Sequence, residues 1–402
     1  MTPWMRALAL LTIGACLLVG GALAQQTQVQ RGEYLARAGD CVSCHTKPGG
    51  AAYAGGLRMK TPFGDVVAPN ITPDAATGIG TWSADDLYRA LHSGVGKKVG
   101  DLFPAMPYTF FTTVTREDSD AIYAYLRSLA PVRNAVVADQ LAWPFSVRMS
   151  MIGWNEIFFT EGTFKPVTGQ SAEWNRGAYL VEGLGHCSAC HSPRDVLGGI
   201  EKNKAFTGAT IDGWFALNLT SNLKTGLGGW SIDELVAYLK TGAAKGKSTT
   251  LGDMAEVVHN SLSFMTDADL RAMATYLKSI PADSSLAGRG AVQKVPAQAA
   301  TLYVDHCAGC HQAKGRGLPG VFPPLAGNGV VVAPDAANII KVVLEGVPAK
   351  GGYIPMPSLA RQLSDAQIAE ISNYVRTNWG NAAPANVTPQ AVADLRRALP
   401  AK

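Results

Sequence analysis

The sequence Cys187-Ser188-Ala189-Cys190-His191 decides how this chain is organised, because the same pattern occurs twice more. The other copies are Cys41-Val42-Ser43-Cys44-His45 and Cys307-Ala308-Gly309-Cys310-His311. Cys-x-x-Cys-His is the attachment pattern of a c-type haem. Two thiols three residues apart lie on one side of a helical turn, where each can add to a haem vinyl group. The adjacent histidine then supplies the proximal nitrogen ligand of the iron.

Two other uses of a Cys-x-x-Cys pair fit the sequence less well. A zinc site takes four ligands, usually from two spaced pairs, but these pairs lie far apart in the chain and each has its own histidine. A thioredoxin-like dithiol does not need the trailing histidine. The pattern uses six of the seven cysteines. The sequence therefore predicts three covalently bound haem c groups, on Cys41, Cys44, Cys187, Cys190, Cys307 and Cys310, with His45, His191 and His311 as iron ligands.

The composition excludes one class of partner and the N-terminus indicates export. With a net charge of +4 and 16% charged residues, the chain has no basic stripe for nucleic acid. Arg6, an apolar run to Gly21 and Ala22-Leu23-Ala24 predict a signal peptide over residues 1–24. A lipoprotein signal ending before Cys16 and a retained membrane anchor are the alternatives. Cleavage leaves no spare thiol, and export agrees with covalent haem attachment in the periplasm.

An internal repeat divides the rest of the chain. Arg31-Gly32-Glu33-Tyr34-Leu35 precedes the first motif and Arg176-Gly177-Ala178-Tyr179-Leu180 precedes the second. Each unit closes with a predicted helix, and the three N-caps are Thr115, Thr266 and Ser364. Three residues after these caps stand Asp118, Asp269 and Gln367, the spacing of a capping box. The prediction is an all-α fold of three tandem haem domains with long loops. The boundaries are 26–134, 171–281 and 296–380, with a linker at 135–170 and a tail at 381–402.

The sixth iron ligand decides the chemistry of each haem, since methionine there raises the reduction potential and gives an electron carrier. Met106 in Pro104-Ala105-Met106-Pro107 and Met356 in Ile354-Pro355-Met356-Pro357 are the candidates in the first and third domains. Proline on both sides stiffens a loop that must hold a thioether over a metal. Met254 is the candidate in the second domain. Weaker rivals are Met59, Met265 and Met273.

Other polar residues keep two interpretations. Asn70, Asn218, Trp82, Trp230 and Arg194 either bond haem propionates or fix their loops. His92, His186, His259 and His306 are expected to be exposed or hydrogen-bonded. The linker between Phe145 and Phe159 is apolar on most helical faces, which predicts burial against another domain, or against a catalytic subunit or the membrane.

The chain resembles the triple-haem cytochrome c subunits of bacterial membrane-bound dehydrogenases, which include quinoprotein alcohol dehydrogenases and flavin-dependent gluconate, sorbitol and fructose dehydrogenases. The resemblance covers nearly the whole mature chain and is carried by residues 31–45, 70–74, 78–82, 171–191, 254–258 and 322–328. It implies cytochrome c-like domains with His45, His191 and His311 as proximal ligands. It also implies Met106, Met254 and Met356 as axial sulfurs.

The resemblance further implies a role and a location. A separate quinoprotein or flavoprotein subunit would oxidise an alcohol, sugar or sugar acid at the periplasmic face of the bacterial inner membrane. Electrons would pass through the three haems to ubiquinone, so this chain is not expected to be an enzyme on its own. Membrane attachment in the family is largely peripheral and often C-terminal, whereas the tail here is short and contains Arg396-Arg397. The rivals are a multihaem enzyme of peroxidase or thiosulfate-oxidising type with one open haem, and a free carrier.

Overall fold

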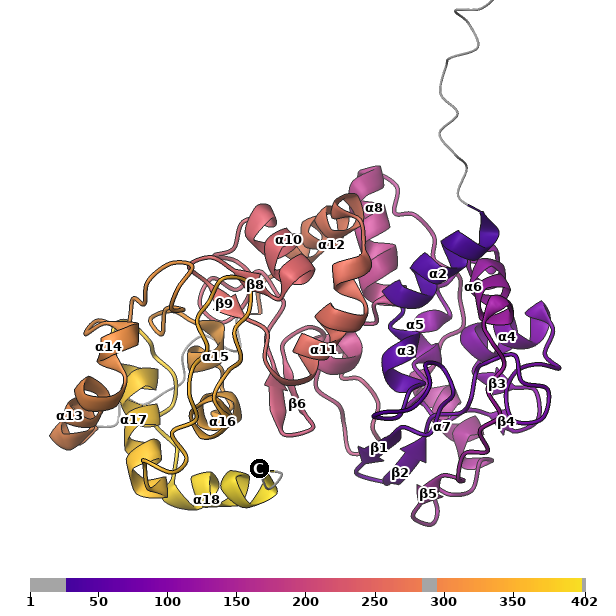
Figure 1. Ribbon diagram of the computed structural model, residues 1–402. Coiled ribbons are helices and arrows are strands. Elements are labelled where there is room, and N and C mark those ends of the chain that lie inside the picture. Colours follow the sequence, from indigo (N-terminus) through magenta and orange to yellow (C-terminus); the bar gives the residue numbers. More distant parts are fainter. Residues whose placement is uncertain (1–26, 284–294, 400–402) are drawn as a thin grey trace, which may run out of the picture.

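The computed structural model describes residues 27–283 and 295–399 (Figure 1). The predicted signal peptide at 1–24 lies outside the described residues. Helices predominate in the described part, which confirms the helical prediction in its coarse form, and the loops carry short antiparallel strands that the all-α prediction did not include. We refer to the predicted domains as units one, two and three.

Unit one and the linker contain the following elements. They are α2 (Gln28–Ala38), α3 (Cys41–Cys44), β1 (Arg58–Thr61), β2 (Gly64–Val67), α4 (Ala84–His92), β3 (Val95–Gly96), β4 (Gly100–Asp101), α5 (Tyr108–Phe111), α6 (Arg116–Ser128), β5 (Gln140–Leu141) and α7 (Ser150–Phe158). Strand β5 of the linker extends the β1–β2 hairpin into a three-stranded sheet, so the linker is attached to unit one.

Unit two repeats the order of unit one, and unit three is shorter. Unit two holds α8 (Ala172–Ala178), the π-helix η1 (Tyr179–Leu184), α9 (Ser188–His191), η2 (Lys202–Lys204), β6 (Ala209–Ile211), β7 (Trp214–Ala216), α10 (Ile232–Thr241), β8 (Ala243–Ala244), β9 (Ser248–Thr249), α11 (Gly252–Asn260), η3 (Leu262–Phe264) and α12 (Asp267–Ser279). Unit three and the tail hold α13 (Ala297–His306), α14 (Ala308–His311), α15 (Gly329–Val332), α16 (Ala337–Glu345), α17 (Asp365–Thr377) and α18 (Pro389–Ala398).

In each unit the closing helix packs against the opening helix: α6 on α2, α12 on α8 and α17 on α13. The crossings in units one and two depend on a glycine. A Cβ on Gly32 would lie 1.8 Å from the carbonyl oxygen of Ala121, and a Cβ on Gly177 would lie 1.9 Å from that of Ala272. Any side chain at either position would push the two helices apart, which explains the glycine of the repeated Arg-Gly-x-Tyr-Leu sequence.

Unit two has one residue more than unit one between that sequence and its motif: residues 36–40 separate Leu35 from Cys41, and residues 181–186 separate Leu180 from Cys187. The π-helix η1 lies in this stretch. A π-turn accommodates one extra residue without changing the helix on either side. The motif of unit two therefore keeps its orientation relative to α8.

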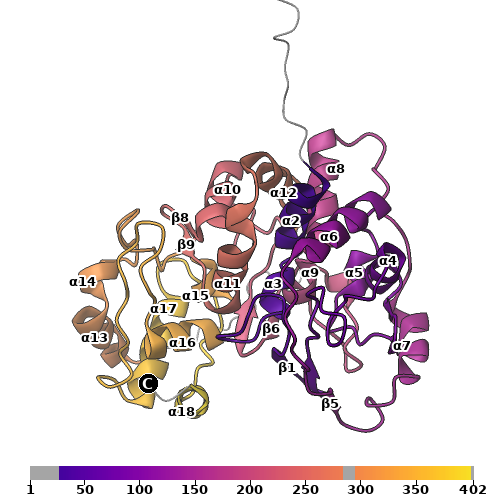
Figure 2. The same cartoon turned by 45° about the vertical axis from the view of Figure 1, so that its right-hand side comes forward.

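Units one and two share one core, whereas unit three has its own. A single cluster of buried side chains includes Leu35 and Ile122 of unit one with Leu180 and Leu277 of unit two. A second cluster holds the core of unit three and the fully buried Val392 of the tail helix α18. Figures 1 and 2 show α18 against the end of unit three, on α16 and α17. The tail thus forms an amphipathic helix with its apolar face covered.

The closing helices begin at Thr115, Thr266 and Ser364, as the sequence predicted, and each side chain accepts from the backbone N–H three residues on. Only Ser364 and Gln367 complete a reciprocal capping box. The expected boxes at Asp118 and Asp269 are wrong, because both carboxylates accept hydrogen bonds from other side chains.

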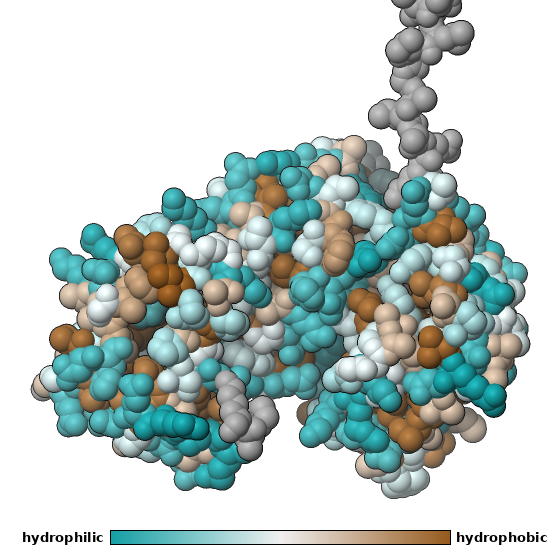
Figure 3. All heavy atoms as spheres, viewed as in Figure 1, coloured by the Kyte–Doolittle hydropathy of each residue, from teal (hydrophilic) through white to brown (hydrophobic). Residues whose placement is uncertain are grey.

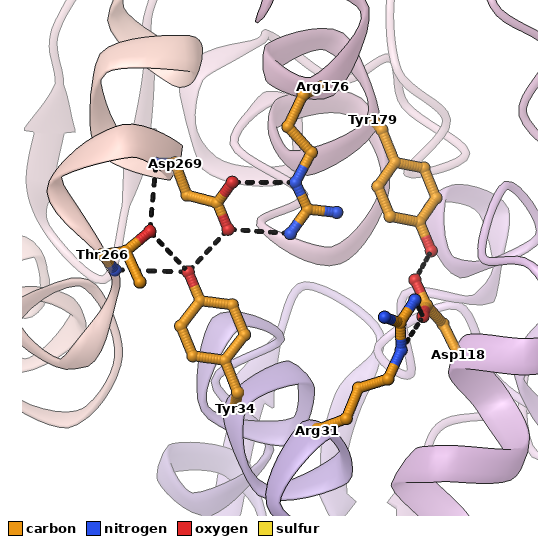
Figure 4. Close-up of polar contacts among 7 residues, drawn as sticks. All are labelled: Arg31, Tyr34, Asp118, Arg176, Tyr179, Thr266 and Asp269. Carbon is orange, nitrogen blue, oxygen red and sulfur yellow. Dashed lines mark hydrogen bonds and ion pairs between the residues drawn. The ribbon is translucent and has the colours of Figure 1, made fainter. Parts of the chain in front are cut away.

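Each of these two carboxylates accepts a hydrogen bond from a tyrosine of the other unit (Figure 4). Asp118 accepts from Arg31 of its own unit at 2.5 Å and from the Tyr179 hydroxyl of unit two at 2.6 Å. Asp269 accepts from Arg176 of its own unit at 2.7 Å and from the Tyr34 hydroxyl of unit one at 2.6 Å. Since both tyrosines belong to the repeated sequence, the two units contact each other through equivalent surfaces. We call these contacts the crossed tyrosines.

Candidate haem-binding sites

Each Cys-x-x-Cys-His sequence forms a short helix directly after the opening region of its unit: α3, α9 and α14. The turn into α3 passes through Asp40 in the left-handed region, at φ 49°, and His186 takes a similar conformation before the second motif. Both cysteines of a motif thereby project from one helical turn. Cys41 and Cys187 pack against the core shared by units one and two, and Cys307 packs against the core of unit three.

The three motif histidines are oriented by the same contact. Nδ1 of His45 lies 2.7 Å from the carbonyl oxygen of Pro69, and Nδ1 of His191 lies 2.6 Å from that of Leu217. Nδ1 of His311 lies 3.0 Å from the carbonyl oxygen of Pro323. A carbonyl accepts only from a protonated Nδ1, so this contact sets the tautomer and directs Nε2 away from the backbone. Burial lowers the pKa of all three rings, which favours the neutral form that a metal needs.

The thiols lie in surroundings that suppress thiolate formation. Burial is the largest cause in each case, and it raises the pKa of Cys41 and Cys187 to about 12 and that of Cys44 and Cys307 to about 11. A redox-active dithiol needs a lowered thiol pKa. These cysteines therefore do not have the environment of a thioredoxin-like pair.

The candidate methionines border the same cores as the motifs. Met106 and Met254 pack against the shared core, and Met356 packs against the core of unit three. Among the rivals, Met265 and Met273 are 2% and 1% exposed inside the shared core, which is the position of packing residues. These placements agree with Met106, Met254 and Met356 as axial ligands, and the assignment stays a prediction.

The remaining polar candidates mainly fix their loops. Asn70 accepts from the backbone N–H of Thr72 and donates to the carbonyl of Val132, and Asn218 accepts in the same way from Thr220. Arg194 donates to the carbonyls of Ala189 and Gly198. Trp82 packs against the shared core, the Trp230 ring lies against Tyr238, and Met59 lies in strand β1.

The other histidines lie outside the Cys-x-x-Cys-His sequences, although His186 and His306 directly precede one. His259 and His306 are exposed, and Nε2 of His92 lies 3.3 Å from Glu161. His186 is half-buried, and desolvation of its ring lowers its pKa to about 4. Within residues 27–283 and 295–399, no three side chains of His, Cys, Asp or Glu gather as a site for a metal ion.

The motifs of units one and two lie close together, which the sequence did not predict. The Asn260 amide, at the end of α11 in unit two, donates to the Ser43 hydroxyl inside the first motif at 2.9 Å. Helix α11 of unit two contacts α3, and burial and then the charges of Asp40, Cys190 and Glu256 raise the pKa of Cys44. The repeat indicated two similar units, but no pattern within either one specifies that their motifs border one shared core.

The residues present fit a covalent haem in each unit. Paired cysteines lie on one helical turn, the adjacent imidazole is held through Nδ1, and an apolar core with a methionine at its border faces the motif. Apolar walls and an oriented axial imidazole are the means by which a protein holds a haem and tunes its potential. The fold and these motif helices define the chain as a c-type cytochrome.

Comparisons with known proteins agree with this class. The cytochrome c family model matches residues 29–130 and 296–379. The gluconate 2-dehydrogenase cytochrome c subunit of Pantoea cypripedii is 40% identical, over 93% of this chain and 90% of its own length. The cytochrome c subunit of the quinone alcohol dehydrogenase of Gluconacetobacter polyoxogenes is 39% identical, over 94% and 87%. The fructose dehydrogenase cytochrome subunit of Gluconobacter japonicus is 36% identical, over 93% and 84%. The chain belongs to this family of cytochrome c subunits of bacterial dehydrogenases.

Proposed function

We propose that this chain is a three-haem cytochrome c subunit that carries electrons from a dehydrogenase catalytic subunit to ubiquinone. The observation that carries the proposal is the contact made by all three motif histidines, whose Nδ1 atoms lie within 3.0 Å of a backbone carbonyl. The names of the relatives support a dehydrogenase partner. The chain is an electron-transfer subunit, and oxidation of the organic substrate belongs to the partner.

A haem in unit two is part of the proposal, because the cytochrome c family model matches only units one and three. Unit two carries the same motif, the same histidine contact and the same thiol burial as its neighbours. Its opening and closing helices also pack as those of unit one do. We therefore assign haem-binding roles to Cys187, Cys190 and His191, as to Cys41, Cys44, His45, Cys307, Cys310 and His311.

We place the chain at the periplasmic face of the inner membrane, associated peripherally. No helix in the described part of the chain is long and apolar enough to cross a membrane. Around α7, one side packs on unit one through Met151, while Trp143, Met149, Ile152 and Ile157 are more than half exposed. Exposed aromatic and aliphatic side chains clustered in one segment suit the boundary of a membrane or a partner subunit. On the face in Figure 3, apolar side chains form separate small patches.

The side chains have defined tasks in electron transfer. A haem supplies an iron that gains and loses one electron. The cysteines fix its edge to the motif helix, and the carbonyls of Pro69, Leu217 and Pro323 hold the imidazoles in one tautomer. Buried cores exclude water and favour the neutral ring. Met106, Met254 and Met356 would supply thioether sulfurs, a type of iron ligand that raises the reduction potential.

Mass spectrometry of the exported chain tests the haem count. We expect three covalent additions of haem mass, falling to two when both cysteines of any one motif are replaced by alanine. A wild-type chain with two additions, and no change on replacing Cys187 and Cys190, would contradict a haem in unit two.

Purification from the native host tests the role. We expect an associated dehydrogenase whose substrate reduces the haems, followed by their reoxidation on adding a short-chain ubiquinone. A multihaem enzyme would instead show one iron without methionine in the wild-type chain, as a missing share of the methionine-to-iron charge-transfer absorption. A chain isolated without any dehydrogenase would favour a free carrier.

A further inference from the structure

The loop that carries Met356 is tied to unit two by one buried side chain. Val347 and Met356 exchange two backbone hydrogen bonds of 2.9 Å, which closes the loop between them. Tyr353 lies within this loop and is 4% exposed. Its hydroxyl donates to the Ala244 carbonyl at 2.9 Å and accepts from the Gly246 N–H at 2.8 Å. Both partners belong to the β8–β9 hairpin of unit two.

The loop that carries Met106 is tied in the same way to the linker. Tyr108 stands two residues after Met106, is fully buried, and donates from its backbone N–H to the Met106 carbonyl at 2.7 Å. Its hydroxyl donates to Oδ1 of Asn155, in α7, at 2.6 Å. The Tyr108 ring also meets Phe159 edge-on, with ring centroids 5.1 Å apart. The linker helix thus holds the methionine loop of unit one from outside.

The candidate methionine of unit two is held differently from those of units one and three. Met254 lies in α11, where the hydrogen bonds of the helix already fix its backbone. Met106 and Met356 lie in loops between prolines, where the backbone bonds of each methionine go to other loop residues and not to a continuous helix. A thioether is a neutral, weak ligand, so the share of iron that keeps it depends on how firmly its loop is held. The two loop methionines have an external tyrosine contact, and the helical one has its helix.

We propose that Tyr108 and Tyr353 are positioning residues for the axial methionines Met106 and Met356. Each hydroxyl bonds the methionine loop to a segment outside its own unit, and would thereby hold the sulfur in place to ligate a bound haem iron. The inference rests on the proposed function, since it assumes a haem in units one and three. It makes the ligation of the third haem depend on unit two, and that of the first haem depend on the linker.

Imidazole titration of the full-length, oxidised, haem-loaded chain tests the proposal, because imidazole competes with methionine for the iron. Loss of one buried hydrogen bond shifts an equilibrium about fivefold. Tyr353→Phe should therefore raise the apparent imidazole affinity of one haem about fivefold and lower the midpoint potential of that haem. Met356→Ala, which removes the sulfur, identifies the haem concerned. An unchanged affinity and potential in Tyr353→Phe would overturn the inference for unit three.

The pair in unit one permits a stricter test. Tyr108→Phe and Asn155→Ala remove the same hydrogen bond from opposite sides, so each should raise the imidazole affinity of the first haem. The double variant should show no higher imidazole affinity than either single variant, because both substitutions remove the same hydrogen bond. Additive effects, or no effect of Asn155→Ala, would contradict the proposal for unit one.

The matched control is Tyr123→Phe. Its hydroxyl also lies in unit one and donates to the Trp82 carbonyl at 2.7 Å, away from the methionine loop. It should leave imidazole affinity unchanged. A wild-type chain with fewer than three haems contradicts the proposed function, whereas unchanged titrations in fully loaded tyrosine variants contradict this inference alone.

Discussion

The Tyr34 hydroxyl of unit one donates to Oδ2 of Asp269 in unit two at 2.6 Å, across 235 positions of sequence. Tyr179 makes the reciprocal contact to Asp118, also at 2.6 Å. Each carboxylate is held at the same time by an arginine of its own unit. The crossed tyrosines therefore connect the opening helix of each unit to the closing helix of the other. This contact holds together the two units whose motifs border one shared core.

Removal of the crossed hydroxyls should weaken the joint between units one and two. We expect Tyr34→Phe and Tyr179→Phe each to lower the free energy of unfolding by about 2 kcal/mol, as for a hydrogen bond to a charged group. Urea unfolding followed by tryptophan fluorescence measures this. Tyr123→Phe, which removes a bond to a backbone carbonyl within unit one, should cost about 1 kcal/mol. Equal small losses in all three variants would show that the crossed tyrosines add nothing specific.

Stability should fall in acid through Asp269. Burial alone would raise the pKa of this carboxyl, but hydrogen bonds from Arg176 and Tyr34 and the guanidinium charge hold it below its usual value of 3.8. A carboxyl with a lowered pKa stabilises the fold above its unfolded pKa and loses that contribution as pH falls through its folded pKa. The melting temperature should therefore fall below about pH 4. In Asp269→Asn this part of the pH dependence should be absent, and an identical acid profile would contradict the assignment.

The glycines at the helix crossings should not tolerate a methyl group. Gly32→Ala and Gly177→Ala place a Cβ within 1.9 Å of a backbone oxygen, so the helices must separate. We expect a loss of about 3 kcal/mol each in chemical unfolding. Gly153→Ala is the control, since a Cβ there meets nothing within 4 Å and the residue lies outside the haem motifs. If the three variants were equally stable, the close helix contact would not exist in solution.

Substitution of Met254 and of Met265 in unit two should have different effects, because we assign the first to the iron and the second to the core. Met254→Ala should remove one of three methionine-to-iron charge-transfer contributions, because we assign its sulfur to the iron. Met265→Ala empties a site that is 2% exposed and should cost about 3 kcal/mol of stability while leaving that absorption intact. Absorption spectra and thermal unfolding of both variants decide the assignment. The reverse result would make Met265 the ligand.

Local signals in the sequence specified much of the fold. The N-caps at Thr115, Thr266 and Ser364 depend on residues within one helical turn, so they could be predicted. The motifs likewise depend on fixed short spacings. The capping boxes at Asp118 and Asp269 were wrong because distant arginines and tyrosines compete for those carboxylates.

The relation between units could not be predicted for the same reason. Tyr34 is an ordinary helical tyrosine until its partner in unit two is known, and Tyr353 shows its role only against the Ala244 carbonyl. Sequence periodicity specifies which face of a helix is apolar, but it does not specify which helix covers that face. The tail helix illustrates this, since its apolar face packs on unit three.

The π-helix at Tyr179–Leu184 limits how the two similar halves can be exchanged. In an ordinary α-helix, one additional residue rotates everything after it by about 100°. A chimaera that joined the start of α8 to the motif of unit one would lack the residue that the wide turn absorbs. Its thiols would then face away from their pocket. Chimaeras of units one and two should therefore be joined outside residues 31–44 and 176–190. Each motif then keeps the helix that precedes it in its own unit.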